Sequence, residues 1–418
     1  MGRRGTARAL ARALLAVPRM ELLVILCLGL VAYSFVGYPA VLAAWTGVRE
    51  ALEGVRFVAG GPDRRARKRD DRWPSVSIVV AAHDEETCIR QKVENCLSLD
   101  YPADRLEVLV GCDGCADQTA ALARSTGDPR VTVVEAPRAG KAAVLSRLVP
   151  KAQGDVVVLT DANVTFDRGA LKALARHFQE PAVGAVVGRL RLYNRVKRDY
   201  EESLYWRYET VLKYWEGKQG CVLGANGGIY ALRRLLFQPL RETTITDDFV
   251  VPVRIASRGW RVPYEPEAVA YEETTEDVAL DFGRRARIGA GNWQSILLVP
   301  EVLDPRSGFL HFAFVSHKLL RWLTPLFLVV ALLLSLPLAV LGGVAWKALL
   351  LCQLGFYGLA LAGRLGARGP FRRISSLAHY FVSMNAALAV GFWRFLRGTQ
   401  QAAWNRTERS GTPGVRAA

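Results

Sequence analysis

The sequence predicts an α/β fold with a Rossmann-like, doubly wound sheet that is preceded and followed by apolar helices. Two observations support this prediction. Between residues 75 and 160, β-branched runs alternate with segments of helical spacing, which is the pattern of parallel strands joined by crossover helices. Long apolar stretches flank the region from about 73 to 300, and that region contains none itself.

Four β-branched runs have the length and composition of buried parallel strands. They are residues 75–82, 106–111, 131–135 and 156–160. Helical spacing follows the first three, in residues 86–99, 117–125 and 141–149. Beyond Asn163 we expect helices at 168–179, 200–218, 247–257 and 281–295, and extended segments at 183–190, 229–232 and 260–264.

Four apolar stretches are candidates for membrane helices, since a hydrocarbon layer of roughly 30 Å needs about 20 helical residues. They are residues 22–45, 323–346, 348–363 and 374–393. The first has no small-residue cleavage pattern and ends in aromatic residues, which favours an uncleaved anchor over a signal peptide. Residues 301–322 mix apolar and basic side chains, as in a helix that lies in the membrane interface.

The predicted organisation has seven parts. In order they are a basic segment (1–20), a transmembrane anchor (21–45), a basic linker (46–73), a soluble domain (74–300), an interfacial helix (301–322), a transmembrane bundle (323–397) and a basic tail (398–418). The boundaries follow the changes in hydropathy and charge along the chain.

The formal net charge of +16 raises the question of nucleic-acid binding. Many basic residues flank the apolar stretches, for example in 64–69 and 364–373, and the positive-inside rule explains that distribution. We therefore expect no nucleic-acid partner, an inner or plasma membrane location and a cytoplasmic central domain. The seven cysteines form no disulfide framework, and the single Cys112-Asp-Gly-Cys115 pair is weak support for zinc or redox chemistry.

Four short acidic motifs mark the central domain. They are His83-Asp84-Glu85-Glu86, Cys112-Asp113-Gly114, Thr160-Asp161-Ala162-Asn163 and Thr246-Asp247-Asp248. The first three follow predicted strands, and an open α/β sheet binds its ligands at the carboxyl ends of its strands.

These motifs, in this order, resemble those of the membrane-bound family 2 glycosyltransferases, which include cellulose, hyaluronan and chitin synthases and bacterial exopolysaccharide synthases. The resemblance covers nearly the whole chain. It implies a GT-A fold, the Rossmann-like fold of nucleotide-diphospho-sugar transferases. It also implies a metal-dependent hexosyltransferase that moves a sugar from a UDP-sugar to a growing β-linked polysaccharide with inversion.

The resemblance assigns nucleotide binding to Glu85, Asp113, Lys141 and Arg287. Glu85 and Asp113 match the acidic ends of the first two strands, and Lys141 closes an Arg-x-Gly-Lys segment at a helix start, where phosphate can bind. Arg287 matches the family's Gln-x-x-Arg-Trp helix. From the residues alone, the carboxylates of the first motif also suit a helix N-terminus, Asp113-Gly114 also suits a turn, and the Lys141 segment suits a solvated basic turn.

Asp161 and Asn163 take the place of the family's Asp-x-Asp, which implies Mg²⁺ or Mn²⁺ bound through oxygen ligands. Asn163 keeps an oxygen but lacks the charge of the usual acid. Asp248 matches the acid of the family's Thr-Glu-Asp and is the implied catalytic base. A helix N-cap is the structural alternative for Asp247 or Asp248.

For the acceptor, the resemblance implies Asn226 in the glycine-rich segment 223–228 and an aromatic platform at Trp293. Trp293 lies six positions after Arg287, where the family has a tryptophan adjacent to the arginine. The segment 404–409 (WNRTER) resembles a C-terminal element of these synthases and requires a cytoplasmic tail, although three crossings after a cytoplasmic domain would place it outside.

Two alternatives remain open: transfer of a single sugar to a membrane lipid, and a non-catalytic membrane scaffold with a degenerate transferase domain. The expected partners are the UDP-sugar, a polysaccharide or lipid acceptor, membrane lipids, and a second copy of the chain or an export partner. The sequence contains no HExxH, Gly-x-Ser-x-Gly or Walker motif, and no Gly-x-Gly-x-x-Gly after the first strand.

Overall fold

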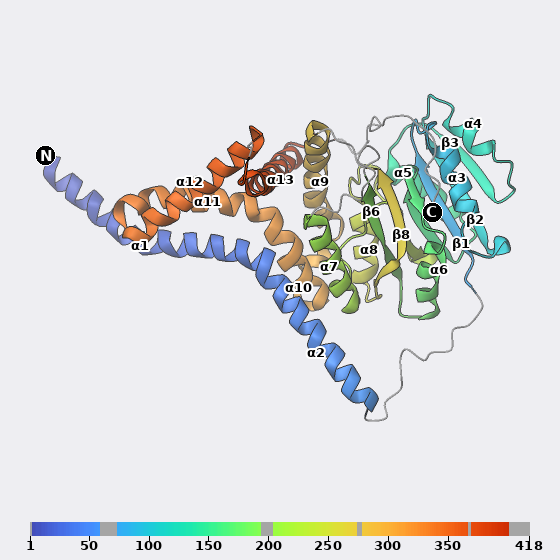
Figure 1. The fold of residues 1–418 in the computed structure, drawn as a ribbon, viewed down its shortest axis with the longest axis horizontal. Helices are drawn as coiled ribbons and strands as arrows, with labels where there is room; N and C mark the ends of the chain where they lie inside the picture. Colours follow the sequence, from blue (N-terminus) through green and yellow to red (C-terminus); the bar gives the residue numbers. More distant parts are fainter. Residues whose placement is uncertain (1, 59–72, 194–203, 274–277, 367–368, 401–418) are drawn as a thin grey trace. The chain divides into compact units, whose positions relative to one another are not determined.

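The computed structural model describes residues 2–58, 73–193, 204–273, 278–366 and 369–400. The chain divides into two compact units (Figure 1). A helical unit comprises Met1–Val41, Val278–Trp293 and Phe314–Thr399, and a sheet unit comprises Leu42–Asp277, Gln294–Ala313 and Gln400–Ala418. The basic run 64–69 and the segment 404–409 lie outside the described residues.

Among the residues that the structure describes, the sheet unit has eight strands in the order β3-β2-β1-β4-β7-β6-β8-β5. The strands are β1 Val76–Ala82, β2 Leu106–Asp113, β3 Val131–Ala136, β4 Val156–Asp161, β5 Val164–Phe166, β6 Ala185–Tyr193, β7 Tyr230–Arg233 and β8 Tyr264–Glu273. Strands β1 to β4 pair in parallel, β7 is antiparallel to both neighbours, and β5 is antiparallel to β8. The sheet is therefore mixed, with a parallel half that carries the first three acidic motifs.

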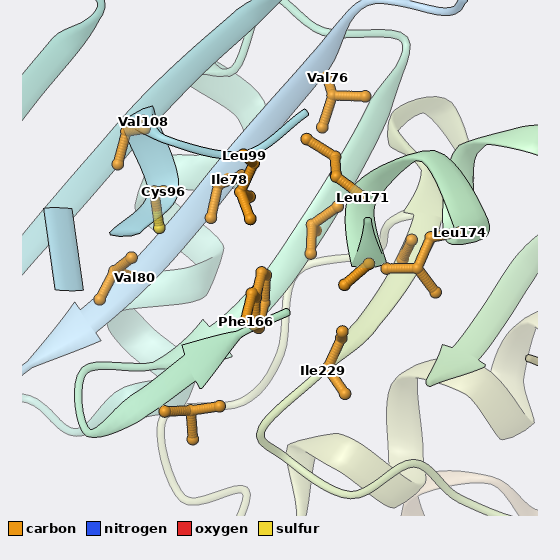
Figure 2. Close-up of a cluster of buried hydrophobic side chains, with 14 of the residues drawn as sticks. Val76, Ile78, Val80, Cys96, Leu99, Val108, Phe166, Leu171, Leu174 and Ile229 are labelled. Atoms are coloured by element: carbon orange, nitrogen blue, oxygen red, sulfur yellow. The ribbon is translucent and has the colours of Figure 1, made fainter. Parts of the chain in front are cut away.

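The helices of the unit are α2 Tyr38–Val58, α3 Ile89–Leu97, α4 Thr119–Arg124, α5 Lys141–Leu148, α6 Ala170–Ala175, α7 Leu204–Lys218, α8 Asp247–Ser257 and α10 Phe309–Ala313. Helices α3 and α6 cover one face of this sheet, and α5 covers the other. On one face, alternate residues of β1 such as Ile78 and Val80 pack with Cys96 of α3 and Leu171 of α6 (Figure 2). On the opposite face of β2, Gly111 approaches the α5 side chains so closely that a Cβ there would lie 2.4 Å from Val144.

The predicted strands of the parallel half are confirmed to within two residues at either end. Helix α8 matches its predicted range, and α3, α4 and α6 are shorter than predicted, because their outer residues form turns or a 3-10 segment. The extended segment expected at 260–264 contains parallel β-bridges at Arg261 and Val262 and leads into β8, which begins at Tyr264 and continues further than expected, to Glu273. Strand β5 was not predicted, since three residues are too few to show a period.

The helical unit contains α1 Gly2–Ala32, α9 Val278–Leu298 up to Trp293, α11 Leu320–Leu341, α12 Val344–Arg364 and α13 Arg372–Arg397. Within it, Val24 and Cys27 of α1 pack against Ala331 and Leu338 of α11. Among the described residues, four helical stretches are long and apolar enough to cross a membrane: Val17–Val55, Phe309–Leu341, Val344–Arg364 and Arg372–Arg397.

Two expectations for these segments differ from the structure. The break between the second and third apolar segments lies at Gly342-Gly343, so Trp346 belongs to α12 and not to the preceding helix. Two glycines interrupt a helix more readily than the apolar residues that follow. The expected interfacial helix 301–322 is two 3-10 turns followed by a helix that continues into α11 through a π-helical stretch, Phe314–Leu319.

Candidate functional site

The carboxyl ends of three parallel strands bring the acidic motifs to one edge of the sheet. In the register of the sheet, Ala81 of β1 is opposite Asp161 of β4, and Ala82 is opposite Cys112 of β2. Asp161 and Asp113 are the last residues of their strands. The ligand edge predicted from the sequence is therefore formed by these strands.

Lys141 and two carboxylates form an ion cluster at this edge. The Lys141 Nζ lies 2.7 Å from Asp161 Oδ1 and 3.5 Å from Asp247 Oδ2. Burial acts to lower the pKa of the Lys141 ammonium, but the two carboxylates outweigh it and raise the pKa above its ordinary value. Lys141 therefore remains charged and connects the third acidic motif to the fourth.

The two acids of the fourth motif have different surroundings. Asp247 is buried and accepts a hydrogen bond from the Tyr230 hydroxyl at 3.3 Å, in addition to its contact with Lys141. Asp248 is partly exposed. Burial, followed by the like charge of Asp247, raises the pKa of Asp248 to about 6, against the opposite effect of Lys141. Asp248 therefore binds a proton more strongly than an ordinary aspartate, as suits a general base.

The N-cap alternative for these acids is not supported. The N-cap of α8 is Thr246, with no side-chain capping bond, and Asp247 and Asp248 occupy the first helical turn. The N-cap of α3 is Cys88, also without a side-chain capping bond, so neither Asp84 nor Glu85 caps that helix.

Gly227 lies close to the side chains of Asp161, Lys141 and Asp248. A Cβ added at this glycine would be 3.2 Å from Asp161 Oδ2, 3.3 Å from Lys141 Nζ and 3.8 Å from Asp248 Oδ2. The glycine-rich loop predicted to border the acceptor site thus leaves a space among these groups. Next to it, the Oδ1 of Asn226 accepts a hydrogen bond from the buried Lys213 of α7, and the Ala225 N–H donates to the Asp248 carbonyl at 2.7 Å.

The turn that follows β4 offers oxygen ligands of the kind that Mg²⁺ and Mn²⁺ accept. The Asp161 side chain is one-third exposed, and the Asn163 amide is directed by a 3.2 Å hydrogen bond from its Nδ2 to Glu272 Oε1. Buried Lys92 stabilises this turn, because its Nζ donates to Thr160 Oγ1 at 3.0 Å and to the Val164 carbonyl at 2.6 Å. Together with the space at Gly227, this donor set fits a hard divalent cation.

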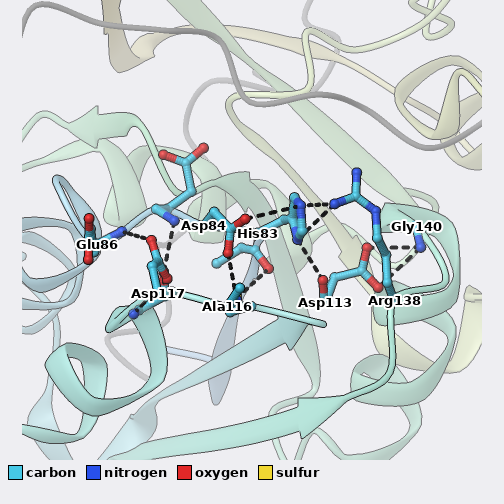
Figure 3. A network of polar contacts seen from close by, with 12 residues as sticks. His83, Asp84, Glu86, Asp113, Ala116, Asp117, Arg138 and Gly140 are labelled. Carbon is cyan, nitrogen blue, oxygen red and sulfur yellow. Dashed lines mark hydrogen bonds and ion pairs between the residues drawn. The ribbon is translucent and has the colours of Figure 1, made fainter.

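Asp113 orders the loop that leads to Lys141. Its Oδ1 accepts from the Ala139 N–H at 2.6 Å, and its Oδ2 accepts from the Gly140 N–H at 2.9 Å (Figure 3). Asp113 is 2% exposed. The two amides that precede the N-terminus of α5 therefore bind this carboxylate, and Gly114 makes the predicted tight turn with φ of +61°.

His83 and Asp84 connect the first two strand ends (Figure 3). The His83 Nδ1 donates to the Asp113 carbonyl at 2.7 Å, and Asp84 Oδ1 accepts from the Ala116 N–H at 2.8 Å. His83, Asp84 and Cys115 bring three potential metal-ligand atoms within 4.8 Å of one another. The Arg138 guanidinium contacts the His83 ring, and its positive charge opposes a metal cation at this position.

The remaining predicted site residues are buried or lie in the helical unit. Glu85 is 7% exposed and its Oε2 accepts from the Cys88 thiol at 3.1 Å. Arg287 and Trp293 lie on α9, within the part that belongs to the helical unit. The Trp293 ring packs against Phe392, with centroids 4.7 Å apart, and its buried indole N–H has no hydrogen-bond partner among the described residues.

Lys213, Tyr230 and Glu272 are close to this site and were not predicted. Lys213 lies in an aromatic helix, and Tyr230 begins a strand that resembles any buried strand. Glu272 is one of several acids in β8. Gly227, by contrast, belongs to the glycine-rich segment that the sequence predicts to border the acceptor site.

The mixed sheet and the acidic cluster at the carboxyl ends of its parallel strands agree with the GT-A fold that the motifs imply. Residues 74–291 match the family described as "Glycosyltransferase like family 2". Because this match covers more than half of the chain, the protein belongs to that family. The resemblance stated from the motifs is therefore confirmed at the level of family and fold.

Known proteins with detectable similarity include both lipid and polymer synthases. The chain is 30% identical over 247 residues to a "Beta-monoglucosyldiacylglycerol synthase" of Synechocystis sp., covering 54% of this chain and 49% of that protein. It is 24% identical over 243 residues to a "Poly-beta-1,6-N-acetyl-D-glucosamine synthase" of Staphylococcus aureus, covering 54% and 57%. The chain thus matches about half the length of these relatives.

Among solved structures, the fold is similar to that of a mannosyltransferase from Pyrobaculum calidifontis, determined in complex with GDP-Man and Mn²⁺. The TM-score is 0.63 at 24% identity, covering 90% of this chain and 99% of that one. At this identity the similarity establishes the GT-A fold.

Proposed function

We propose that this protein is an inverting glycosyltransferase that transfers a sugar from a UDP-sugar to an acceptor hydroxyl at the edge of the sheet. The observation that carries the proposal is the cluster of Asp161, Lys141, Asp247 and Asp248 around the space at Gly227. This cluster combines a base of raised pKa, a buried cation and oxygen ligands for a metal at one place.

Asp248 would take the proton of the acceptor hydroxyl. As that oxygen attacks the anomeric carbon, the bond to the nucleotide diphosphate breaks on the opposite side, so the product is inverted. A base with a pKa of about 6 is mostly ionised at neutral pH and still accepts a proton well. Asp247, held by Tyr230 and Lys141, would position Lys141 and keep the pKa of Asp248 raised.

The donor would be held on two sides. Asp161 and Asn163 would bind Mg²⁺ or Mn²⁺, which neutralises the charge of the leaving diphosphate when bound. Asp113 and the loop that it orders would face the uridine, with Glu85 behind it, and Arg287 would add a charge suited to the diphosphate. Asn226 would contact the acceptor sugar, and the resemblance alone supports Trp293 as an aromatic platform for it.

For the acceptor we propose a growing β-linked polysaccharide, made at the inner or plasma membrane by a cytoplasmic sheet unit. The order of the motifs and the similarity to a poly-N-acetylglucosamine synthase support this proposal. A lipid acceptor is the second candidate, because a relative with 30% identity is named as a glucosyldiacylglycerol synthase. The four apolar helices suit either acceptor.

The catalytic proposal is tested by UDP release from a panel of UDP-sugars, with full-length protein in detergent and Mn²⁺ or Mg²⁺. Asp248→Asn should lower turnover by at least about 100-fold, the scale of general base catalysis. Asp104→Asn is the matched control, because Asp104 lies in an exposed 3-10 turn with its side chain 81% exposed. Unchanged turnover in Asp248→Asn would refute the assignment of Asp248 as the base, whereas no UDP release by the wild type with any donor would favour the scaffold alternative.

The acceptor is tested with the same protein and a labelled donor sugar. A polymerase should yield product of high mass that remains in the aqueous phase. If all label is found in a low-mass, organic-soluble product, the polysaccharide proposal fails and the lipid acceptor replaces it.

A further inference from the structure

The metal motif of this chain has an amide where its family has a carboxylate, and the structure places another carboxylate next to that amide. Asn163 lies in the turn between β4 and β5, and its Nδ2 donates to Glu272 Oε1 at 3.2 Å. Glu272 is fixed by the sheet, because it is opposite Val164 in the antiparallel β5–β8 pair. Each partner is thus held by the backbone, one by the turn and the other by the strand.

A carboxylate accepts hydrogen bonds and, when ionised, donates none, so only the NH₂ end of an asparagine amide can face it. In an amide, the oxygen and the nitrogen lie on opposite sides of the carbonyl carbon. The contact with Glu272 therefore turns Asn163 Oδ1 away from Glu272 and leaves it available as an oxygen ligand. Without this partner, either end of the amide could face a cation, and the NH₂ end would repel it.

We infer that Glu272 is a positioning residue of the metal site, which fixes the amide of Asn163 with its oxygen toward a cation shared with Asp161. The inference rests on the proposed metal-dependent function and adds a residue to it. Glu272 also places a negative charge next to Asn163. In a chain with Asp-x-Asp, the second aspartate of the motif supplies that charge itself. Partners of metal ligands commonly orient them in this way, and their removal typically lowers metal affinity by about 10- to 100-fold.

Orientation and charge can be separated by a double-mutant cycle. Glu272→Gln removes the charge and also the bias, since a glutamine amide can face Asn163 with either end. In an Asn163→Asp background no amide remains to be oriented, because the two oxygens of a carboxylate are equivalent. There, Glu272→Gln can act only through charge. Non-additivity of the two substitutions therefore reports the orienting role itself.

The experiment is a titration of full-length protein in detergent with Mn²⁺ alone, followed by electron paramagnetic resonance of free Mn²⁺. Glu272→Gln should weaken Mn²⁺ binding by about 10-fold in the wild-type background. In the Asn163→Asp background the same change should cost no more than about threefold. Glu273→Gln is the control, because the next residue of a strand points to the opposite face of the sheet.

Two outcomes would overturn the inference: an unchanged Mn²⁺ affinity in Glu272→Gln, or an equal loss in both backgrounds, which would mean that Glu272 acts by charge alone. Melting temperatures of all variants exclude loss of the fold as a cause. Asp161→Asn separates this inference from the proposed function. If Asp161→Asn abolishes Mn²⁺ binding and Glu272→Gln does not alter it, only the role of Glu272 fails, whereas no effect of Asp161→Asn removes the metal site as a whole.

Discussion

Lys141 Nζ lies 2.7 Å from Asp161 Oδ1, so the residue that opens α5 is joined directly to the residue that ends β4. The loop before Lys141 is held in turn by Asp113, at the end of β2. The strand ends of the parallel half are thus connected by charge and by hydrogen bonds. The pKa of Asp248 therefore depends on the charges of its neighbours: Asp247 raises it and Lys141 lowers it.

Asp247→Asn should shift the acidic limb of the pH–rate profile to lower pH. In the wild type, kcat/KM should rise with pH around a midpoint of about 6, because Asp248 must be ionised to act as a base. Removing the like charge of Asp247 stabilises ionised Asp248, so the midpoint should fall below that of the wild type. An asparagine can still accept the Tyr230 hydrogen bond. A midpoint that stays the same or rises would contradict this electrostatic account.

Lys141→Met should have the opposite effect on the same profile. The ammonium of Lys141 lowers the pKa of Asp248, so its removal should shift the midpoint above that of the wild type. Turnover at the plateau should also fall, by about 100-fold, because the carboxylates lose their cation. The exposed Lys151 provides the control Lys151→Met, which should leave both quantities unchanged. Equal profiles for the two variants would exclude Lys141 from the site.

Gly227→Ala should reduce activity with little loss of stability. The added Cβ would lie 3.2–3.3 Å from Asp161 and Lys141, which displaces the groups that must contact the donor. We expect kcat/KM to fall by about 10- to 100-fold, as for small misplacements of reacting groups. Gly169→Ala is the matched control, since its Cβ would meet only Asp167, at 3.8 Å. If the two alanine variants have the same kcat/KM, the space at Gly227 is not used.

Asp113→Asn should destabilise the loop that carries Lys141. An asparagine presents one NH₂ group to backbone N–H donors, which leaves a buried donor without its acceptor, at a cost of about 1–3 kcal/mol. For a domain of this size we expect the melting temperature to fall by about 2–12 °C. The KM for the donor should rise at the same time. Asp104→Asn serves as the exposed control, and a melting temperature equal to that control would show that Asp113 does not hold the loop.

The parallel half of the fold was predictable because its strands are continuous apolar runs that are buried on both faces. Strands β5 and β8 were not. Strand β8 contains a proline and several glutamates, so neither its length nor its pairing with β5 follows from composition. Its pairing depends on the tertiary fold, which brings residue 272 next to residue 164.

The candidate site was also predictable only in part, namely for the residues that belong to its acidic motifs. Asp161 and Asp248 follow from their motifs, and the structure brings both next to Lys141. The roles of Tyr230 and Lys213 could not be predicted, because a buried tyrosine and a lysine in an aromatic helix have no distinctive spacing. The choice of Asp248 over Asp247 as the base rested on resemblance alone. The different surroundings of the two acids now give that choice a physical reason.

The contact between Asn163 and Glu272 also has a consequence for the synthesis of the protein. The two residues are 109 positions apart, and β8 is the last strand along the described part of the chain. As the chain leaves the ribosome, the parallel strands can pair early, whereas the turn at Asn163 must wait for β8. We therefore expect nascent chains that end before Glu272 to contain a folded parallel half and no high-affinity Mn²⁺ site.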